Sequence, residues 1–513
     1  MLTTAAVVAL MTVASQSAMD ARSKDWRNGA VIYQVFVDRF SRSIDFESRK
    51  ALFKAPRKLM EWSDLPKGGK RLDDLGLWSH ELEFWGGDLL GVDDKLDYIQ
   101  QVGADVVYLT PIFKALTNHK YDTQDYSEIS PDVGTAADLL TLTKDIHKRN
   151  MKIMLDGVFN HMGKTSKAFQ DASTDTRSQY RDWFYFGKEY PLGYRGWAGV
   201  NNLPALKLEN PAVRQFLWND DDSIVKRYLK QGADGWRLDV AFELGPTYLS
   251  ELTKAAHSAK PGSAVVGEIS GYPANWFPAV DGVFNFSSAI VGFDMLRGTI
   301  SGGRAGQMLG HMVADAGIDN MLKSWLLTDN HDTDRLATIV PDQTERNLIH
   351  TLQFTLPGSP VIYNGTELGI PGQGDPANRA PMRWDLVNGQ NQDLTMVKQL
   401  AKLHRENPAL RYGDFTALDT DKLLAFTRTT DKLRDTVIVI VNPTDLPVKE
   451  VFATRVGRLM SWGDMKDLLT GAHLNTVSGF ITAEMKPKTA MILVPVIDKS
   501  KGYSAYDRID EHP

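Results

Sequence analysis

The 513-residue chain contains no cysteine, and this absence removes several kinds of chemistry at once. Disulfide bridges, thiolate metal sites and cysteine nucleophiles are all excluded, because each of them needs a thiol. No HExxH helix motif occurs either, which leaves a zinc hydrolase unsupported. Any catalysis must therefore come from carboxylates, histidines or hydroxyl groups.

The chain also lacks a strong excess of charge of either sign. Its 58 basic and 64 acidic residues leave a formal charge of -6. This small imbalance argues against binding to nucleic acid or to anionic membranes, since both attract strongly basic surfaces. With 42% hydrophobic residues, the chain can bury a large core and is expected to contain more than one structural unit.

Long hydrophobic runs are absent as well, so no membrane-spanning helix is expected. Residues 1–18 combine a short apolar run with small residues at its end, which predicts a secretory signal peptide and a secreted or periplasmic protein. No lysine or arginine precedes the run. A cytoplasmic protein with a frayed N-terminus is therefore the alternative.

Eight short runs rich in β-branched and aromatic residues alternate with stretches of helical periodicity. This alternation predicts an α/β protein with a (β/α)8 TIM barrel, and a doubly wound open sheet is the alternative. Amphipathic helices are expected between the runs, for instance over 136–149 and 210–230. The eight runs are 30–40, 104–111, 152–161, 235–241, 264–269, 282–286, 323–332 and 360–367.

Two polar intervals, 41–84 and 162–204, are too long to be ordinary connections between a strand and its helix. Because they follow the first and third strands, they are predicted to lie over the carboxyl-terminal face of the barrel. We predict a catalytic barrel over 28–161 and 205–408, with residues 162–204 as a small inserted B domain.

Beyond the last barrel helix, the pattern changes to short runs that alternate apolar and polar residues. Examples are LLAFTR at 423–428 and TVIVIV at 436–441. Period-two alternation is typical of half-buried antiparallel strands. A separate C-terminal β-sandwich domain is therefore predicted over 410–498.

Four of the eight runs end in charged or polar residues. In a TIM barrel such strand ends converge on one pocket. Each residue alone has a structural explanation, such as capping a helix or closing a turn. Burying charged and polar side chains costs folding free energy, so selection for stability alone would not bring so many of them together. Their convergence therefore indicates a catalytic site. The strand ends supply Asp156, Asn160, His161, Arg237, Asp239, Glu268, Asp329, His331 and Asp332.

A pair of carboxyl groups can cleave an acetal with retention when one attacks the sugar and the other donates a proton. Arg237 lies on the same strand face as Asp239 and favours its ionised form, so Asp239 is the predicted nucleophile. Glu268 ends an apolar strand and is the predicted acid/base. Asp332 is expected to stabilise oxocarbenium-like charge, while the two strand-end histidines donate hydrogen bonds to the same sugar.

With these residues in place, the sequence resembles the α-amylase family of glycoside hydrolases, whose four short signature regions occur here in order. By this resemblance Asp239, Glu268 and Asp332 are implied to be nucleophile, general acid/base and transition-state stabiliser. The matches are DGVFNH at 156–161, GWRLDVAFE at 235–243, GEIS at 267–270 and DNHDT at 329–333, and they imply substrate contacts for His161, Arg237 and His331.

The resemblance extends to two loops and to a metal position. His119 and Tyr121 lie in a stretch, HKYD, whose tyrosine stacks under the cleaved sugar in the family, and Asp375 and Arg379 lie in the loop that binds the next glucose. Asn160 stands where many members bind a structural calcium. The chemistry itself is expected to need no cofactor. Aromatic residues on the top-face loops are either sugar platforms or packing residues, namely Trp85, Trp183, Tyr194 and Trp197.

Within the family, the chain is most similar to neopullulanases, cyclomaltodextrinases and maltogenic amylases, over about residues 30–496. The subgroup's N-terminal domain has no counterpart before the first strand, so a monomer is expected rather than the subgroup's dimer. Four side chains also depart from the usual pattern, and substrate preference is therefore not carried over. They are Phe242 and Glu243 in place of Lys-His, Ser270 in place of Trp, and Lys207 in place of Asn.

The expected activity is retaining hydrolysis of α-1,4-glucosidic bonds, with α-1,6 bonds also in range, in maltooligosaccharides, cyclodextrins or starch. An exo-acting α-glucosidase or a transglycosylase is the alternative, because water and sugar compete for the same glycosyl-enzyme intermediate. A non-catalytic sugar-binding barrel is the remote alternative, since a fold does not determine function. The presence of all three carboxylates disfavours it.

Overall fold

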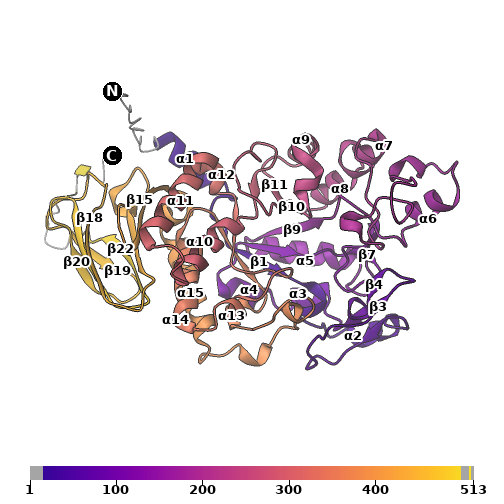
Figure 1. Ribbon diagram of the computed structural model, residues 1–513, viewed down its shortest axis with the longest axis horizontal. Coiled ribbons are helices and arrows are strands. Elements are labelled where there is room, and N and C mark those ends of the chain that lie inside the picture. Colours follow the sequence, from indigo (N-terminus) through magenta and orange to yellow (C-terminus); the bar gives the residue numbers. More distant parts are fainter. Residues whose placement is uncertain (1–15, 498–505, 507, 510–513) are drawn as a thin grey trace.

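The computed structural model describes residues 16–497, 506, 508 and 509. Figure 1 shows a central barrel with long loops at one end and a C-terminal sheet domain at the other. Of the predicted signal peptide, residues 1–15 lie outside the described residues, and the rest begins helix α1 (Gln16–Lys24). Among the described residues, no helix has both the length and the apolar character needed to cross a membrane.

The predicted TIM barrel is confirmed. Eight parallel strands pair in the order β12-β11-β10-β9-β6-β1-β14-β13, and a parallel bridge between Phe284 and Trp325 joins the two ends of this sheet. Each strand overlaps one predicted run. The strands are β1 (Ile32–Val35), β6 (Val106–Leu109), β9 (Lys152–Gly157), β10 (Gly235–Leu238), β11 (Ala264–Gly267), β12 (Gly282–Val283), β13 (Trp325–Leu327) and β14 (Ser359–Tyr363).

Helices cover the outside of the barrel, and α5 (Ala136–Lys148) shows why they form. The Thr135 hydroxyl caps the first turn by accepting a hydrogen bond from the Asp138 amide, and the Asp138 carboxylate in turn accepts one from the Thr135 amide. Its buried residues recur at helical spacing and face the sheet. The other main helices are α3 (Leu89–Asp93), α4 (Leu96–Val102), α9 (Ala241–Ala259), α10 (Phe286–Leu296), α11 (Gly302–Ala316), α14 (Gln343–Thr355) and α15 (Gln392–Glu406).

Two helical expectations differ from the structure. The predicted helix 210–230 is divided into α7 (Pro211–Arg214), a π-helical turn and α8 (Ile224–Lys230), because three consecutive aspartates at 220–222 interrupt its apolar face. The connection between β11 and β12 contains no helix. Pro273 and Pro278 fall within it, and proline lacks the amide that a helix interior requires.

The two long intervals meet over the mouth of the barrel. In the first, β3 (Arg71–Leu72) and β4 (Leu77–Trp78) form a short antiparallel hairpin; the second contains α6 (Lys167–Thr174). Gly76 in the hairpin turn has φ +73°, and a β-carbon there would lie 2.9 Å from the Asn201 β-carbon. The hairpin and the later interval therefore touch directly, at the right-hand end of Figure 1.

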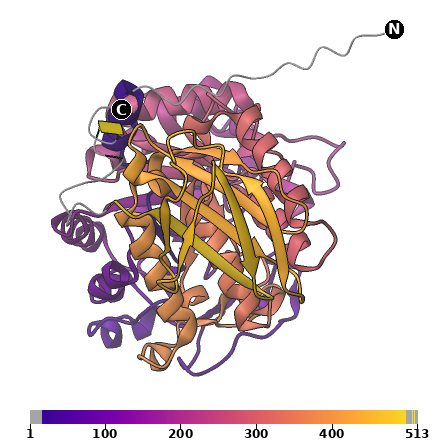
Figure 2. The same cartoon turned by 90° about the vertical axis from the view of Figure 1, so that its left-hand side faces the viewer.

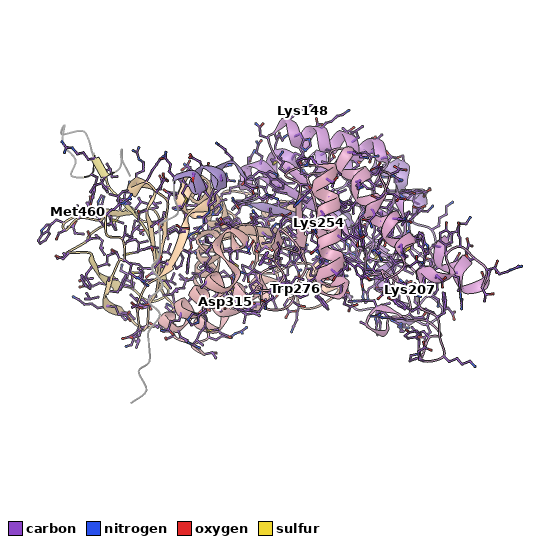
Figure 3. The ribbon with its side chains drawn as sticks, turned by 90° about the horizontal axis from the view of Figure 1, so that it is seen from above. Lys148, Lys207, Lys254, Trp276, Asp315 and Met460 are labelled. Carbon is purple, nitrogen blue, oxygen red and sulfur yellow. The ribbon has the colours of Figure 1, made fainter. Side chains whose placement is uncertain are left out.

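The C-terminal antiparallel domain is also confirmed. Its larger sheet runs in the order β15-β16-β17-β22-β19-β20, and a second sheet pairs β18 with β21. Along β17 (Val437–Asn442), the valines at 437, 439 and 441 belong to the barrel core, while Ile438 and Ile440 belong to a core shared with β18 and β21. Figure 2 shows the domain face on, and in Figure 3 its Met460 lies far from Lys207. The strands are β15 (Asp414–Ala417), β16 (Leu424–Thr429), β18 (Val448–Ala453), β19 (Asp464–Asp467), β20 (His473–Asn475), β21 (Phe480–Met485) and β22 (Thr489–Pro495).

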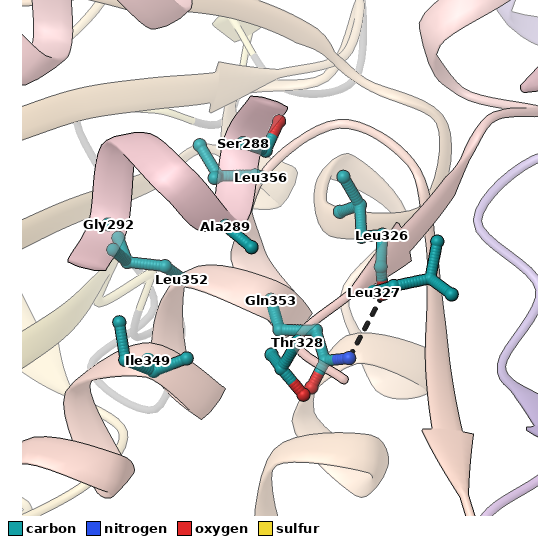
Figure 4. Close-up of a pocket in the computed structure, with 10 residues that line it drawn as sticks. All are labelled: Ser288, Ala289, Gly292, Leu326, Leu327, Thr328, Ile349, Leu352, Gln353 and Leu356. Atoms are coloured by element: carbon teal, nitrogen blue, oxygen red, sulfur yellow. Dashed lines mark hydrogen bonds between the residues drawn. The ribbon is translucent and has the colours of Figure 1, made fainter. Parts of the chain in front are cut away.

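A small apolar cavity lies between α10, β13 and α14 (Figure 4). Its volume is about 20 Å³, and the Gln353 amide closes one side by donating a hydrogen bond of 3.0 Å to the Leu326 carbonyl. This space holds at most one water molecule. It is a packing gap in the barrel wall rather than a binding site.

Candidate active site

The pairing register of the barrel brings the predicted strand-end residues together. Arg237 on β10 lies opposite Asp156 on β9. The Asp239 amide donates to the Gly157 carbonyl at 3.1 Å, and the Glu268 amide donates to the Leu238 carbonyl at 2.9 Å. The hydrogen-bond ladders thus continue to the ends of three neighbouring strands, and their carboxylates project on the same side.

A single guanidinium group, that of Arg237, contacts three carboxylates. Its Nη1 lies 2.9 Å from Asp156 Oδ1 and 3.1 Å from Asp239 Oδ1, and its Nη2 lies 2.9 Å from Glu268 Oε2. The arginine is fully buried. Its positive charge, held in a setting of low dielectric constant, permits three acidic groups to approach one another.

The negative charge of Glu268 affects the pKa of its neighbour Asp239. Burial raises the pKa of Asp239 well above its usual range, opposed by Arg237 and reinforced by the negative charge of Glu268. Burial likewise raises the pKa of Glu268, again opposed by Arg237. The view that Arg237 simply keeps Asp239 ionised is therefore incomplete, because its charge is divided among three groups. The pair retains protons more tightly than isolated carboxyls do.

Glu268 is also held by the backbone that follows Asp239. The Val240 amide donates to Glu268 Oε2 at 2.9 Å. Val240 has φ +46°, a left-handed conformation that is strained for a β-branched residue. In this conformation the amide points toward the Glu268 carboxylate, which lines the cavity.

Asp332 has a different environment. Its two oxygens lie 3.1 Å from His331 Nε2 and 3.0 Å from Arg379 Nη2. Burial alone raises the pKa of Asp332, but His331 and Arg379 outweigh burial and hold that pKa below its usual value. Asp332 is therefore ionised at pH values at which Asp239 and Glu268 can still hold a proton.

The two strand-end histidines are buried and neutral. Burial lowers the pKa of His161 to about 3 and that of His331 to about 3. His331 Nδ1 lies 2.8 Å from the Gln34 amide nitrogen. Neither ring nitrogen of His161 has a hydrogen-bond partner among the described residues, although Nε2 lies 4.0 Å from Asp239 Oδ2. His161 is almost fully buried, but its ring lines the cavity.

The loop between β7 (Phe113–Ala115) and β8 (Thr123–Ile129) supplies His119 and Tyr121. The Tyr121 ring lies parallel to that of His331, with centroids 5.4 Å apart, and its hydroxyl donates to Asp156 at 3.1 Å. His119 Nδ1 accepts from the Tyr121 amide at 3.1 Å. The histidine therefore helps to set the position of the tyrosine.

Asp375 and Arg379 extend the site beyond Asp332. Arg379 Nη1 lies 3.2 Å from Asp375 Oδ2. Burial alone raises the pKa of Asp375, but His80 and Arg379 outweigh burial and hold it well below its usual value. By contrast, Asp329 serves the fold, since its carboxylate accepts from the Leu336 amide and the Thr366 hydroxyl.

A cavity of about 470 Å³ opens above these groups, a volume typical of small-ligand sites. Arg237 and His331 are fully buried behind its wall. Asn160 also lies outside it. The predicted residues that line the cavity are His119, Tyr121, His161, Asp239, Glu268, Asp332, Asp375 and Arg379.

The surroundings of Asn160 do not fit the expected calcium site. Its amide nitrogen donates to Glu243 Oε2 at 3.1 Å, where the resemblance leads one to expect a metal-binding arrangement. Across the described ranges, no cluster of three or more His, Asp or Glu side chains is arranged to hold a metal ion. Calcium prefers several carboxylate and carbonyl oxygens, and Asn160 instead serves as a hydrogen-bond donor.

Sequence reasoning missed two aromatic residues at the cavity rim. Trp78 is 45% exposed and Phe242 is 42% exposed, and both line the cavity. Of the four aromatic residues left open, Trp197 also lines it and stacks on His161 with centroids 5.5 Å apart. Trp85 is fully buried instead. Phe242 lies in the signature region 235–243, so its place near the site could have been predicted from the sequence. The residues around Trp78 in the sequence gave no such indication.

The α-amylase catalytic-domain model matches residues 34–411 of this sequence. The chain belongs to the α-amylase family. This family member is 33% identical over 440 residues to the cyclomaltodextrinase of Geobacillus thermopakistaniensis, an overlap of 82% of this chain and 70% of that protein. It is 31% identical over 492 residues to neopullulanase 2 of Thermoactinomyces vulgaris, covering 91% of this chain and 78% of that protein.

A solved structure of similar fold supports the assignment to the α-amylase family. The ligand-free cyclic α-maltosyl-(1→6)-maltose hydrolase of Arthrobacter globiformis aligns with a TM-score of 0.77 and 27% identity, over 92% of this chain and 99% of that one. The α-amylase family chain is therefore a glycosidase related to enzymes that hydrolyse cyclodextrins, pullulan and maltooligosaccharides.

Proposed function

We propose that the enzyme is a retaining glycosidase that hydrolyses α-1,4-glucosidic bonds, and α-1,6 bonds to a lesser extent, in maltooligosaccharides, cyclodextrins and related α-glucans. The observation that carries this proposal is the shared contact of Asp239 and Glu268 with Arg237, within 3.1 Å, at a cavity of about 470 Å³. Double displacement at an acetal requires one ionised carboxylate as nucleophile and one protonated carboxyl as acid at the same site.

In the first step, a carboxylate oxygen of Asp239 attacks the anomeric carbon while Glu268 donates its proton to the bridging oxygen. The bond between the anomeric carbon and that oxygen breaks, and the chain beyond it leaves as an alcohol. In the second step, Glu268 takes a proton from water, which attacks the glycosyl ester and frees Asp239. The sugar product keeps its α configuration, and the enzyme needs no cofactor for either step.

The remaining residues bind the sugar that is attacked. Asp332 is ionised and faces the cavity, so it stabilises positive charge that develops on the ring. His161 lines the cavity and offers a neutral imidazole to sugar hydroxyls, and the Tyr121 ring supplies an apolar surface beneath the sugar. Arg379 and Asp375 extend these contacts to the next glucose unit.

A specific observation favours transfer to sugars as a second activity. The Phe242 ring is 42% exposed and lines the same cavity as Glu268, and it follows closely after Val240, whose amide holds the Glu268 carboxylate. The leaving group and the incoming acceptor bind on the side of the acid/base. An apolar ring there stacks against a sugar acceptor more favourably than it binds water. A transglycosylase is therefore the second candidate function.

The test is a product profile on maltotriose, β-cyclodextrin, pullulan and soluble starch, with the anomeric configuration read by NMR at early times. We expect α-anomeric maltooligosaccharides, together with transfer products at high sugar concentration. Initial release of β-anomers would contradict retention. Absence of products from all four substrates and from small α-glucosides would support the non-catalytic barrel instead.

A further inference from the structure

Trp78 is an exposed aromatic ring at the rim of the active-site cavity. It is the last residue of the β3–β4 hairpin, residues 71–78, which we call the rim hairpin. The ring is 45% exposed and lines the cavity together with Arg71 and Gly76 of the same hairpin. Large aromatic side chains are usually buried, and an exposed one at a sugar-sized cavity is a surface on which a sugar ring can stack.

The position of Trp78 is set by its neighbours. Its ring stacks on that of His80, with centroids 6.3 Å apart and planes 20° apart. The Arg71 guanidinium lies 5.9 Å from the ring centroid, and the Trp78 amide donates to the Glu81 carboxylate. A ring held in this way loses little conformational freedom when a ligand binds.

A chain of polar contacts leads from Asp332 to this ring. Asp332 contacts Arg379 at 3.0 Å, Arg379 contacts Asp375 at 3.2 Å, and Asp375 lies 3.9 Å from His80 Nε2. Trp78 stacks on that same His80. The rim hairpin is therefore built onto the side of the cavity that holds Asp332.

The acid/base lies on the other side. Glu268 contacts Val240, and Phe242 and Ser270 line the cavity near these two residues in the sequence. Because Glu268 protonates the leaving oxygen, the departing chain lies on that side. The attacked sugar and the sugars on its non-reducing side must then extend past Asp332, toward Trp78.

The rim hairpin also closes this end of the cavity. A β-carbon on Gly76 would lie 2.9 Å from that of Asn201, so the hairpin turn rests directly on the interval after β9. Val200, Asn202 and Leu203 of that interval line the same cavity. Segments more than a hundred residues apart in the sequence thus form one continuous wall.

We propose that Trp78 is the stacking platform for the sugar on the non-reducing side of the attacked one, and that the rim hairpin ends the cavity there. The enzyme then removes glucose or maltose from the non-reducing ends of linear α-glucans in preference to cutting within them, and cyclodextrins, which have no such ends, are its slower substrates. This inference rests on the proposed function and adds to it the length of the released product.

The experiment compares p-nitrophenyl α-glucoside with p-nitrophenyl α-maltoside, which place one and two sugars on this side of the cleaved bond. For Trp78→Ala we expect kcat/KM on the maltoside to fall about tenfold, while the value on the glucoside stays near wild type. Trp78→Tyr should restore most of the loss, because it restores an aromatic surface. From maltohexaose, an Arg71→Ala/Trp78→Ala variant should release longer products than the wild type.

Trp462→Ala is the matched control, because Trp462 is 75% exposed on the C-terminal domain. It should leave the maltoside to glucoside ratio unchanged. An equal fall on both substrates in Trp78→Ala, or no change in their ratio, would overturn this inference while the wild type remains an active retaining enzyme. A wild type inactive on both glycosides and on maltooligosaccharides would overturn the proposed function itself, and this inference with it.

Discussion

Asp239 is a buried carboxyl group and Glu268 a largely buried one, and their ionised forms are costly in the folded enzyme. Burial raises the pKa of both, in each case against the attraction of Arg237. A carboxyl whose pKa is higher in the folded than in the unfolded state stabilises the fold while it is protonated. That contribution is lost as the pH rises through the folded-state pKa.

We predict that Asp239→Asn and Glu268→Gln each lower kcat by at least roughly 10³-fold, because each removes a group that forms or breaks a bond. Both variants should melt at or above the wild-type temperature at pH 7, since an amide resembles the protonated carboxyl. The advantage should shrink below about pH 4, where the wild-type groups are protonated in both states. Calorimetry at the two pH values, with kinetics at pH 7, measures both effects. Near-wild-type turnover in either variant would contradict the roles assigned here.

The pH dependence of the rate should come from the carboxyl pair and not from histidine. The rate should fall at high pH as the pair loses its last proton, and at low pH as the nucleophile gains one. Raised pKa values for Asp239 and Glu268 move both limbs above the range of isolated carboxyls. Because the pKa of His331 is lowered to about 3, His331→Gln should reduce kcat/KM without moving the alkaline limb. A limb that disappears in that variant would identify histidine as the acid.

At the scale of elements, the pairing of β9 with β10 decides which charges meet. Asp156 and Arg237 lie opposite each other in this register, so the guanidinium stands between three strand ends. A one-residue shift would turn Arg237 to the other face of the sheet. The ladder of backbone hydrogen bonds is therefore what brings Arg237 and the three carboxylates together.

Replacing this arginine should affect both stability and rate. Arg237→Gln leaves three buried carboxylates without their counter-charge, and we expect a destabilisation of about 3–5 kcal/mol at pH 7. Part of this loss should be recovered at lower pH, because protonation removes the uncompensated charge. Urea unfolding at pH 5 and pH 7 measures the effect, and Arg304→Gln on the exposed surface of α11 is the control. Equal stability of both variants at pH 7 would show that the array does not depend on Arg237.

At the scale of the whole molecule, the C-terminal domain and the barrel share one core. Val437, Val439 and Val441 of β17 belong to the same buried cluster as the barrel strands and helices. Arg428 reinforces the junction by donating to the Thr355 carbonyl of α14 at 2.8 Å. The two parts are therefore expected to unfold together.

Val439→Ala should lower the free energy of unfolding by about 2 kcal/mol, because it opens a cavity in this shared core. Heat inactivation and calorimetric unfolding should shift together, in a single transition. Val451→Ala, at a residue that is 64% exposed on β18, should change neither. Two separate transitions, with activity surviving the first, would show that the domains are independent.

Much of the fold and of the site was predictable from the sequence because the signals are local. Strands of a barrel are short apolar runs, and the polar residues that end them mark the catalytic face wherever the strands later pack. This reasoning identified the eight strands and placed Asp239, Glu268 and Asp332 at one cavity. It failed for the helix over 210–230, where three adjacent aspartates at 220–222 outweigh the apolar periodicity.

The sequence by itself determined the barrel, the C-terminal antiparallel domain and the set of acidic residues at the strand ends. Only the tertiary structure decided that the Arg237 guanidinium contacts three carboxylates at once, and which aromatic residues reach the cavity. The contact of Gly76 with Asn201 joins segments that lie far apart in the sequence. So does the series of side-chain contacts that leads from Asp332 to Trp78. Such contacts depend on how whole elements pack, and they cannot be predicted from the residues nearby in the sequence.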